Sequence, residues 1–246
     1  MVGGAGIWTP GCTVIGSQNN INQFIKSLFA DGTQGLYLNA QDAVSVSDLS
    51  SIKDLSGRNN HALQANATSR ATLITDPSGY KSLKFDGIDD GYVTQSIDFT
   101  GTDKVTVIAA VRKLSDVPQI PVELSANANS YNGAFYLLSG TVSSGTGYMS
   151  MGRGTNVANT AQAAVSFTYP APDVAVLSVK HDISGDLSSM RRNGVVGIDG
   201  IGDKGTGNFG NYPLMTKAQE ILEIIHSTLA DVAVHPLHSM DKSTPS

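Results

Sequence analysis

Residues 105–112 read Val105-Thr106-Val107-Ile108-Ala109-Ala110-Val111-Arg112. The run is dense in β-branched residues and nearly continuous in apolar character, a pattern that is typical of a strand covered on both faces of a sheet. We therefore predict that residues 104–113 form the central strand of the core. Val107, Ile108 and Val111 are expected to be largely buried there.

Shorter segments before and after this run also have the apolar patterns of β-strands. From Gly35 onwards, apolar residues alternate with polar ones or form short runs bounded by turn residues, as they do in the strands of a two-layer β protein. Asn193-Gly194 is the clearest hairpin turn, because both residue types tolerate a positive φ. The predicted strands, which together suit a sandwich, are residues 35–39, 82–85, 91–94, 104–113, 134–139, 147–151, 163–167, 174–181 and 187–192.

The two ends of the chain have a different character. Residues 1–20 are rich in Gly, Asn, Thr and Ser, and we interpret them as an arm that orders on a partner surface. Asn20 then precedes apolar residues at helical spacing, and Asp31-Gly32 ends the pattern, so one short helix is expected over about residues 20–30. Residues 215–229 fit either a strand or a helix, and the residues beyond them have little that would impose order.

Composition and charge exclude several classes of protein. The chain of 246 residues has 15% charged residues, 40% apolar residues and a formal net charge of −5. Its Lys and Arg residues are scattered singly, so they form no basic stripe for a phosphate backbone, and no nucleic-acid partner is expected. No apolar run reaches the roughly 18 residues that cross a bilayer, so no membrane partner is expected. The single Cys12 excludes an internal disulfide.

Three stretches of the sequence carry a resemblance to a known family. They are Gly35-Leu36-Tyr37-Leu38-Asn39-Ala40-Gln41-Asp42, Asp54-Leu55-Ser56-Gly57-Arg58-Asn59-Asn60-His61-Ala62-Leu63-Gln64 and Leu83-Lys84-Phe85-Asp86-Gly87-Ile88-Asp89-Asp90. In order and spacing they resemble the successive signatures of concanavalin A-like lectin/glucanase domains of the laminin G-like type. The resemblance implies an all-β fold, an antiparallel β-sandwich (jelly roll) over residues 34–214. It leaves residues 1–33 as an N-terminal arm with a short helix, and residues 215–246 as a C-terminal segment and candidate docking tail.

Domains of this subtype that carry a Gly-rich arm are similar to structural proteins of tailed bacteriophages. The resemblance implies a non-enzymatic protein located in a virion, as a component of the tail, a fibre or the capsid surface. The implied partners are other virion proteins, bound through the arm or the C-terminal tail, in a homo-oligomer or multicopy assembly. A host-surface glycan is a further candidate partner. The alternative function is that of a soluble carbohydrate-binding module that recognises cell-surface glycans.

Acidic and histidine side chains gather in the loops of these signatures. Asp86, Asp89 and Asp90 place three carboxylates within five positions of a tight turn, and hard cations such as calcium prefer clustered oxygen ligands. Asp at such positions also caps the turn by accepting backbone N–H bonds; we favour this role and predict no metal site. In the preceding loop, Asp54, Asn59 and Asn60 are expected to fold the chain on their own side chains. His61 has no second His or carboxylate at ligand spacing, so it is expected to be structural.

Catalytic chemistry is not expected, and no cofactor is predicted. Sandwiches that cleave glucans need paired carboxylates, because one must attack while the other donates a proton. The chain has only Glu123, Glu220 and Glu223, which lack the Glu-x-Asp-x-x-Glu spacing. No Gly-x-Ser-x-Gly turn is present for a serine nucleophile.

Glycan binding needs an exposed aromatic face for a sugar ring, with polar groups beside it. The candidate ligand-binding residues are Tyr131, Asn132, Tyr148 and Arg153, joined by Asn156, because they fall on expected loops. The alternative is that these Tyr residues pack at a sheet edge. The only Trp, Trp8, lies in the arm.

Overall fold

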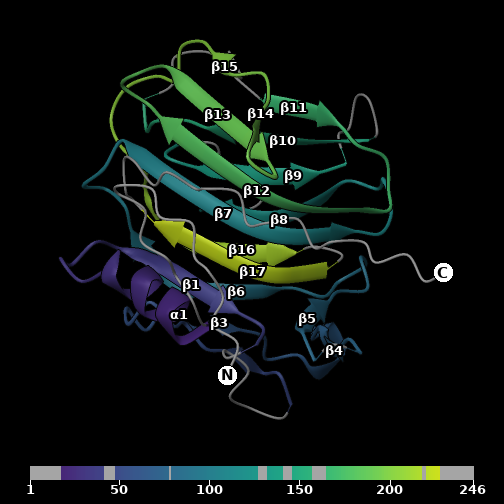
Figure 1. Cartoon of the computed structure of the whole chain (residues 1–246). Coiled ribbons are helices and arrows are strands. Elements are labelled where there is room, and N and C mark those ends of the chain that lie inside the picture. The colour runs from purple at the N-terminus through teal and green to yellow at the C-terminus, as the bar shows by residue number, and fades with distance from the viewer. Residues whose placement is uncertain are drawn as a thin grey trace, which may run out of the picture.

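The structure is a computed structural model, and it describes residues 18–41, 48–77, 79–126, 132–140, 146–156, 165–217 and 220–227. These residues form two antiparallel sheets that face each other, with one helix at their side (Figure 1). Apolar side chains from both sheets share one core cluster. The predicted all-β, antiparallel β-sandwich is therefore confirmed.

The larger sheet has nine strands. From one edge to the other, the main path runs through β14 (Val195–Val196), β13 (Leu187–Arg192), β12 (Asp173–Asp182), β7 (Lys104–Lys113), β17 (Glu220–Ser227), β5 (Lys81–Lys84) and β4 (Thr72–Thr75). Two more strands join this path at its side: β1 (Gly35–Asn39) pairs with β17, and β15 (Gly200–Ile201) pairs with β13. β7 therefore lies near the middle of this sheet, as predicted.

The smaller sheet has eight strands. Their order is β11 (Val165–Thr168), β10 (Gly147–Gly152), β9 (Phe135–Ser139), β8 (Gln119–Leu124), β16 (Asn211–Lys217), β6 (Tyr92–Asp98), β3 (Ala62–Leu63) and β2 (Ser51–Ile52). β8 and β16 were absent from the predicted strands. Each contains a proline, Pro121 or Pro213, and each shows a register shift beside that proline. Since proline cannot donate to a strand ladder, it masks the strand signal in the sequence.

The two faces of the central strand β7 are covered to different degrees. Val105, Val107, Ala109 and Val111 are buried in the core, because alternate residues of a strand point to the same face of the sheet. Ile108 points the other way and is partly exposed. The predicted burial of Val107 and Val111 is confirmed, and Ile108 is less buried than these two residues. On the face that Ile108 shares, Thr106 is buried as well, so the second face of the strand is partly covered.

The C-terminal part of the chain belongs to the sheets. Residues 220–227 form strand β17, so the choice between strand and helix is decided in favour of the strand. One side of β17 pairs with β7, where Ile225 lies opposite Ile108. Its other side pairs with β5 near its start and with β1 along the rest. The sheet therefore extends past residue 214, where the sequence analysis ended the sandwich. The expected docking tail from residue 228 onwards lies outside the described residues.

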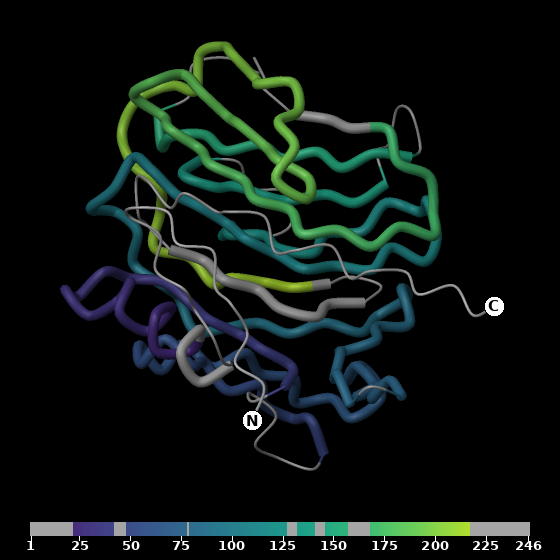
Figure 2. Tube along the Cα trace, viewed as in Figure 1, coloured from purple at the N-terminus to yellow at the C-terminus, as the bar shows by residue number. Residues whose placement is uncertain are grey.

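The predicted helix is present as α1 (Gln18–Ser27), which begins two residues before the expected Asn20 cap. Ile25 and Phe29 bury their side chains against Tyr37 of β1, and the Tyr37 hydroxyl donates to Asn22 Oδ1 at 2.6 Å. This part of the expected arm thus packs on the sandwich, beside β1 (Figures 1 and 2). Residues 1–17 lie outside the described residues. Among the residues that are described, no helix has the length and apolar character needed to span a membrane.

A series of hydrogen bonds between buried side chains connects the two sheets. His181 of β12 is fully buried; its Nε2 lies 2.9 Å from Ser150 Oγ on β10, and its Nδ1 lies 2.8 Å from Ser188 Oγ on β13. The Ser150 hydroxyl donates to the Tyr136 carbonyl at 2.7 Å, so it must accept from Nε2–H. His181 Nδ1 is then the acceptor of the Ser188 hydroxyl. These bonds satisfy polar groups that would otherwise be costly to bury.

Candidate functional site

Tyr148, one of the predicted ligand-binding residues, lies inside the protein. It belongs to β10 rather than to a loop, and it is fully buried. Its hydroxyl donates to Asp173 Oδ2 at 2.7 Å, and Lys113 Nζ lies 5.1 Å from the centre of its ring. Burial raises the pKa of the Tyr148 hydroxyl, and the bond to Asp173 raises it further. Tyr148 therefore offers no face to a sugar, and the packing alternative is correct for this residue.

Arg153 is also buried, which corrects its expected position on an exposed loop. The glycines on either side of it suggested a loop, but they mark close approach between chain segments. A Cβ on Gly152 would lie 2.6 Å from His181 Cγ, and a Cβ on Gly154 would lie 2.3 Å from the Thr206 carbonyl oxygen. Glycine is required where backbones come this close.

The other predicted residues do not complete a site. Asn132 is exposed in the turn before β9, and Asn156 is exposed and bridges to Thr206. Tyr131 lies outside the described residues, so its role in glycan binding stays a prediction. The structure does not bring the predicted residues together on one exposed surface, since Tyr148 and Arg153 face inwards.

The acidic turn between β5 and β6 is capped by its own side chains, as predicted. Asp86 Oδ1 accepts the N–H of Ile88 at 2.8 Å, and Asp90 Oδ2 accepts the N–H of Asp86 at 2.8 Å. Asp89 Oδ2 accepts the Ser69 hydroxyl at 2.7 Å. Carboxylate oxygens of the three Asp residues lie within 4.8 Å of one another, which is close enough to share a hard cation. Burial raises the pKa of Asp90, and the charges of Asp86 and Asp89 add to this rise.

We expect the variant Asp90→Asn to be as stable as the parent chain at neutral pH, or more stable by up to about 1 kcal/mol. Asparagine keeps an oxygen that can accept the Asp86 N–H, and it removes a buried charge next to two like charges. Because the folded-state pKa of Asp90 is above the unfolded-state value of 3.8, this carboxyl lowers stability as pH rises through these two values. The gain should therefore be present at pH 7 and absent at pH 3, as measured by urea unfolding. If calcium stabilised the parent chain and Asp90→Asn abolished that effect, the turn would be a cation site instead.

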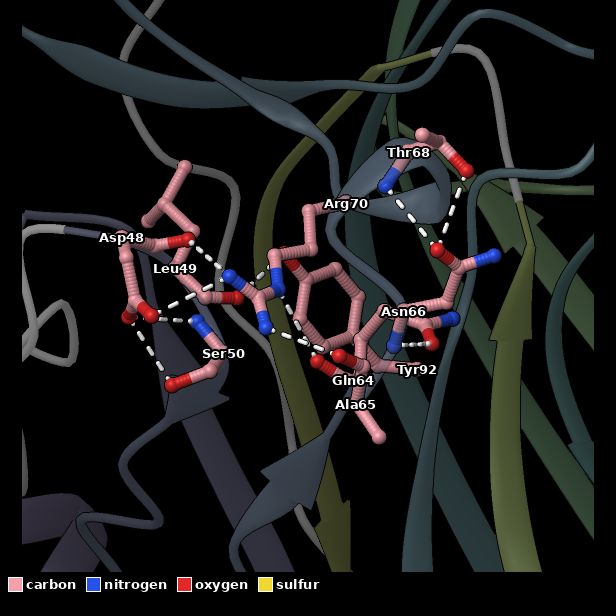
Figure 3. A network of polar contacts seen from close by, with 9 residues as sticks. All are labelled: Asp48, Leu49, Ser50, Gln64, Ala65, Asn66, Thr68, Arg70 and Tyr92. Atoms are coloured by element: carbon pink, nitrogen blue, oxygen red, sulfur yellow. Dashed lines mark hydrogen bonds and ion pairs between the residues drawn. The ribbon is translucent and has the colours of Figure 1, made fainter.

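A polar network next to this turn holds three loops together (Figure 3). The Arg70 guanidinium lies at its centre: Nε donates to the Gln64 carbonyl at 3.0 Å, one terminal nitrogen donates to the Ala65 carbonyl at 2.9 Å, and the other pairs with Asp48 at 3.1 Å. Tyr92 donates its hydroxyl to the Leu49 carbonyl at 2.9 Å, and burial raises its pKa to about 12. The network reaches the acidic turn through Gln64, whose amide donates to the Gly91 carbonyl at 2.6 Å.

The network is structural in character. The Arg70 nitrogens named above donate to groups of the protein, and its side chain is mostly buried. Bonds from Ser50 lower the pKa of Asp48, which keeps this exposed partner ionised at neutral pH. The surface beside the acidic turn is therefore held by hydrogen bonds within the protein. Its exposed residues include two Asp residues of the turn, Asn66, Thr68 and Ile88.

The hairpin loop between β4 and β5 presents an aromatic side chain to solvent. Tyr80 is 57% exposed, more than any other aromatic residue whose side chain the structure describes. Its N–H donates to Asp76 Oδ1 and its carbonyl accepts the Asp76 N–H, both at 2.9 Å. Gln41 fixes the loop from outside: its amide donates to the Gly79 carbonyl at 3.2 Å and accepts the Lys81 N–H at 2.9 Å. The backbone of Tyr80 is thus fixed by hydrogen bonds to Asp76, and Gln41 binds the residues on either side of Tyr80.

Sequence reasoning did not single out Tyr80. A signal was present, because Asp76-Pro77-Ser78-Gly79 has turn composition and directly precedes the tyrosine. Gly79 has a φ of +90°, which suits glycine. Chemically, the Tyr80 ring can stack on the apolar face of a sugar, while Asp76 lies across the loop from it and Lys81 follows it as the first residue of β5.

The acidic residues give little support to hydrolysis. Glu123 lies in β8, and its buried carboxylate accepts the Ser125 hydroxyl at 2.7 Å. Glu220 and Glu223 lie in β17, opposite Lys84 and Asn39 of the neighbouring strands. The expected absence of glycosidase chemistry stays a prediction.

Comparisons with known proteins support the fold. No family model matches the sequence, and no curated protein matches it. Among solved structures, the receptor-binding domain of botulinum neurotoxin D aligns with a TM-score of 0.56 and 10% identity, over 83% of this chain and 50% of that chain. Botulinum neurotoxin type C, whose uptake into cells depends on two ganglioside molecules, aligns with a TM-score of 0.53 and 10% identity, over 86% of this chain and 49% of that one.

An enzyme shares part of the same architecture. Trypanosoma rangeli sialidase, solved in complex with the inhibitor DANA, aligns with a TM-score of 0.51 and 12% identity, over 80% of this chain and 30% of the sialidase. The chain therefore spans about half of the toxin chains and less than a third of the sialidase chain. At these identities the likeness extends to the fold alone: the chain shares the β-sandwich architecture of parts of these proteins.

Proposed function

We propose that this chain is a non-enzymatic carbohydrate-binding β-sandwich that recognises cell-surface glycans. The observation that carries the proposal is the shared sandwich, which aligns over more than four fifths of this chain with the receptor-binding domain of botulinum neurotoxin D and with botulinum neurotoxin type C, whose cell entry depends on two ganglioside molecules. This favours the module that the sequence analysis named as its alternative. The surface around Tyr80 is the ligand surface that we propose, because it combines an exposed ring with neighbouring polar groups.

We further propose that the module works in many copies on a larger particle, and that the particle is the tailed-phage virion expected from the sequence resemblance. A single tyrosine face gives a sugar ring little contact area, so one site should bind weakly. Display of many sites multiplies weak affinities through effective concentration. Imaging of intact particles with an antibody against this chain tests the location.

The variant Tyr80→Ala is expected to weaken glycan binding by about tenfold or more, because removing a well-placed aromatic contact typically costs over 1 kcal/mol. The measurement is a glycan array that carries neutral, sialylated and ganglioside-type sugars, probed first with the monomeric protein and then with a multivalent form. Tyr80→Phe keeps the ring and should keep most of the binding. Asp89→Asn, at the opposite end of β5, should leave binding unchanged.

Three results would contradict the proposal. If the multivalent form bound no glycan on the array, the proposed carbohydrate binding would be wrong. Loss of binding in Asp89→Asn but not in Tyr80→Ala would move the site to the acidic turn. Release of reducing ends from any polysaccharide would show that the protein is an enzyme.

A further inference from the structure

One edge of the larger sheet exposes an unusual amount of apolar surface. Four β-branched side chains in residues 195–201 face solvent: Val195 is 63% exposed, Val196 57%, Ile198 71% and Ile201 83%. These residues span β14 and β15, which both pair with the outer side of β13 in the upper part of Figure 1. We call residues 195–201 the edge segment. Apolar clusters of this kind mark interaction surfaces.

The backbone of the edge segment is open on its outer side. Gly197 N–H donates to the Met190 carbonyl at 3.1 Å, and Gly202 N–H donates to the Asp186 carbonyl at 3.2 Å. Val196 and Ile201, the neighbours of these two glycines, lie opposite Arg191 and Leu187. In an antiparallel ladder, residue pairs that exchange hydrogen bonds alternate with pairs that do not. Because the two glycines bond to β13, the N–H and C=O groups of their neighbours Val196 and Ile201 point away from β13. No strand among the described residues pairs with this outer side.

The edge segment lacks the side chains that usually keep sheet edges apart. Exposed edges are commonly protected by lysine or proline. Residues 194–202 contain neither, and Asp199 is their only charged residue. The opposite edge strand, β4, carries two threonines among its four residues and is less apolar. The edge segment is therefore suited to pairing with another strand.

We propose that this edge binds a second copy of the same chain, in an antiparallel pairing about a two-fold axis. The edge segment is self-complementary. The N–H and C=O groups of Val196 and Ile201 point outwards, and an antiparallel second copy presents the same groups in reverse order. Val196 of one copy then lies opposite Ile201 of the other, twice, and each pair exchanges backbone hydrogen bonds. Both contacts bring apolar side chains together, and the two larger sheets join into one continuous sheet.

This pairing is independent of glycan binding. Tyr80 lies in the loop between β4 and β5, at the far end of the strand order from β14. A dimer formed through the edge segment would carry two Tyr80 loops. Variants of the edge should change the oligomeric state and leave binding by each monomer unchanged, so the two proposals fail separately.

Sedimentation velocity of the full chain over about 1–100 μM tests the proposal. The parent chain should form a dimer, and Val196→Lys combined with Ile201→Lys should weaken the dimer by about tenfold or more, because it places charge in an apolar strand contact. Val174→Lys is the matched control: Val174 is a half-exposed valine of the same sheet, but its strand β12 lies between β7 and β13. This control should dimerise like the parent.

Disulfide trapping tests the register. In a Cys12→Ser background, Val196→Cys together with Ile201→Cys should give a covalent dimer, because cysteines in directly opposed positions can meet disulfide geometry. Val196→Cys alone should not. The proposal is overturned if the parent chain is monomeric throughout, if the double lysine variant dimerises normally, if Val174→Lys disrupts the dimer equally, or if the edge binds only a different protein. Efficient trapping by Val196→Cys alone would overturn the Val196–Ile201 register.

Discussion

The variant Phe135→Ala is expected to lower the free energy of unfolding by about 3–5 kcal/mol. Phe135 is almost fully buried at the start of β9, in the smaller sheet. Its ring meets Phe209 edge-to-face at a centroid distance of 6.0 Å, and it lies 6.1 Å from the His181 ring of the larger sheet. Removing it opens a cavity between the two layers, where surrounding side chains cannot close in without breaking the bonds of His181.

Urea unfolding of the parent and variant chains measures this loss. Ile88→Ala is the matched control, because it also shortens an apolar side chain, but one that is 75% exposed in the acidic turn. The control should change stability by less than about 0.5 kcal/mol. A loss below about 1 kcal/mol in Phe135→Ala would mean that the layers are not closely packed at this point.

The second large effect is expected for Asp54→Ala, which should also cost about 3–5 kcal/mol. Asp54 is buried, and its carboxylate accepts the N–H of Tyr37 at 3.0 Å, the N–H of Ser56 at 2.9 Å and the N–H of Asn60 at 2.9 Å. It also accepts the Ser56 hydroxyl at 2.7 Å. Alanine leaves these donors without an acceptor, and buried donors without an acceptor are costly.

Two further variants test whether the lost stability comes from the buried acceptor oxygens of Asp54 or from removal of any carboxylate in a loop. Asp54→Asn keeps one acceptor oxygen and should lose less stability than Asp54→Ala. Asp31→Ala removes a carboxylate that accepts the Thr33 N–H at 2.9 Å in an exposed loop, and it should cost much less stability than Asp54→Ala. Thermal or urea unfolding of all three gives the comparison. If Asp54→Ala and Asp31→Ala lowered the free energy of unfolding equally, burial of the Asp54 carboxylate would not contribute to stability.

The loop around Asp54 also shows how much of the local structure the sequence could predict. Its expected folding on its own side chains is confirmed for Asp54, whereas the Asn60 amide donates to the distant Gly35 carbonyl at 2.7 Å. The structural role of His61 is confirmed, because its Nδ1 accepts the Asp54 N–H at 3.0 Å. The hairpin at Asn193-Gly194 is confirmed too, since both residues have positive φ. These features depend on residues within a few positions of one another, so the sequence contains nearly all the information that they need.

The candidate ligand-binding residues were harder to predict. Tyr148 and Arg153 carry side chains that suit sugar binding, yet both point inwards. For Tyr148 the deciding contacts come from Lys113 and Asp173, each 25 or more positions away in the sequence. No local pattern contains such contacts.

The sequence by itself determined the all-β class, the position of β7 in the sheet and the turns that bound the strands. It could do so because alternation of apolar residues, turn composition and Asx capping are local properties of the chain. The tertiary structure alone decided that residues 220–227 form a strand between β7 and β5, that Ile108 faces outwards, and that Tyr80 rather than Tyr148 is exposed. Burial depends on which distant strand or sheet covers a side chain, and pairing between distant strands is fixed only when the whole sandwich closes.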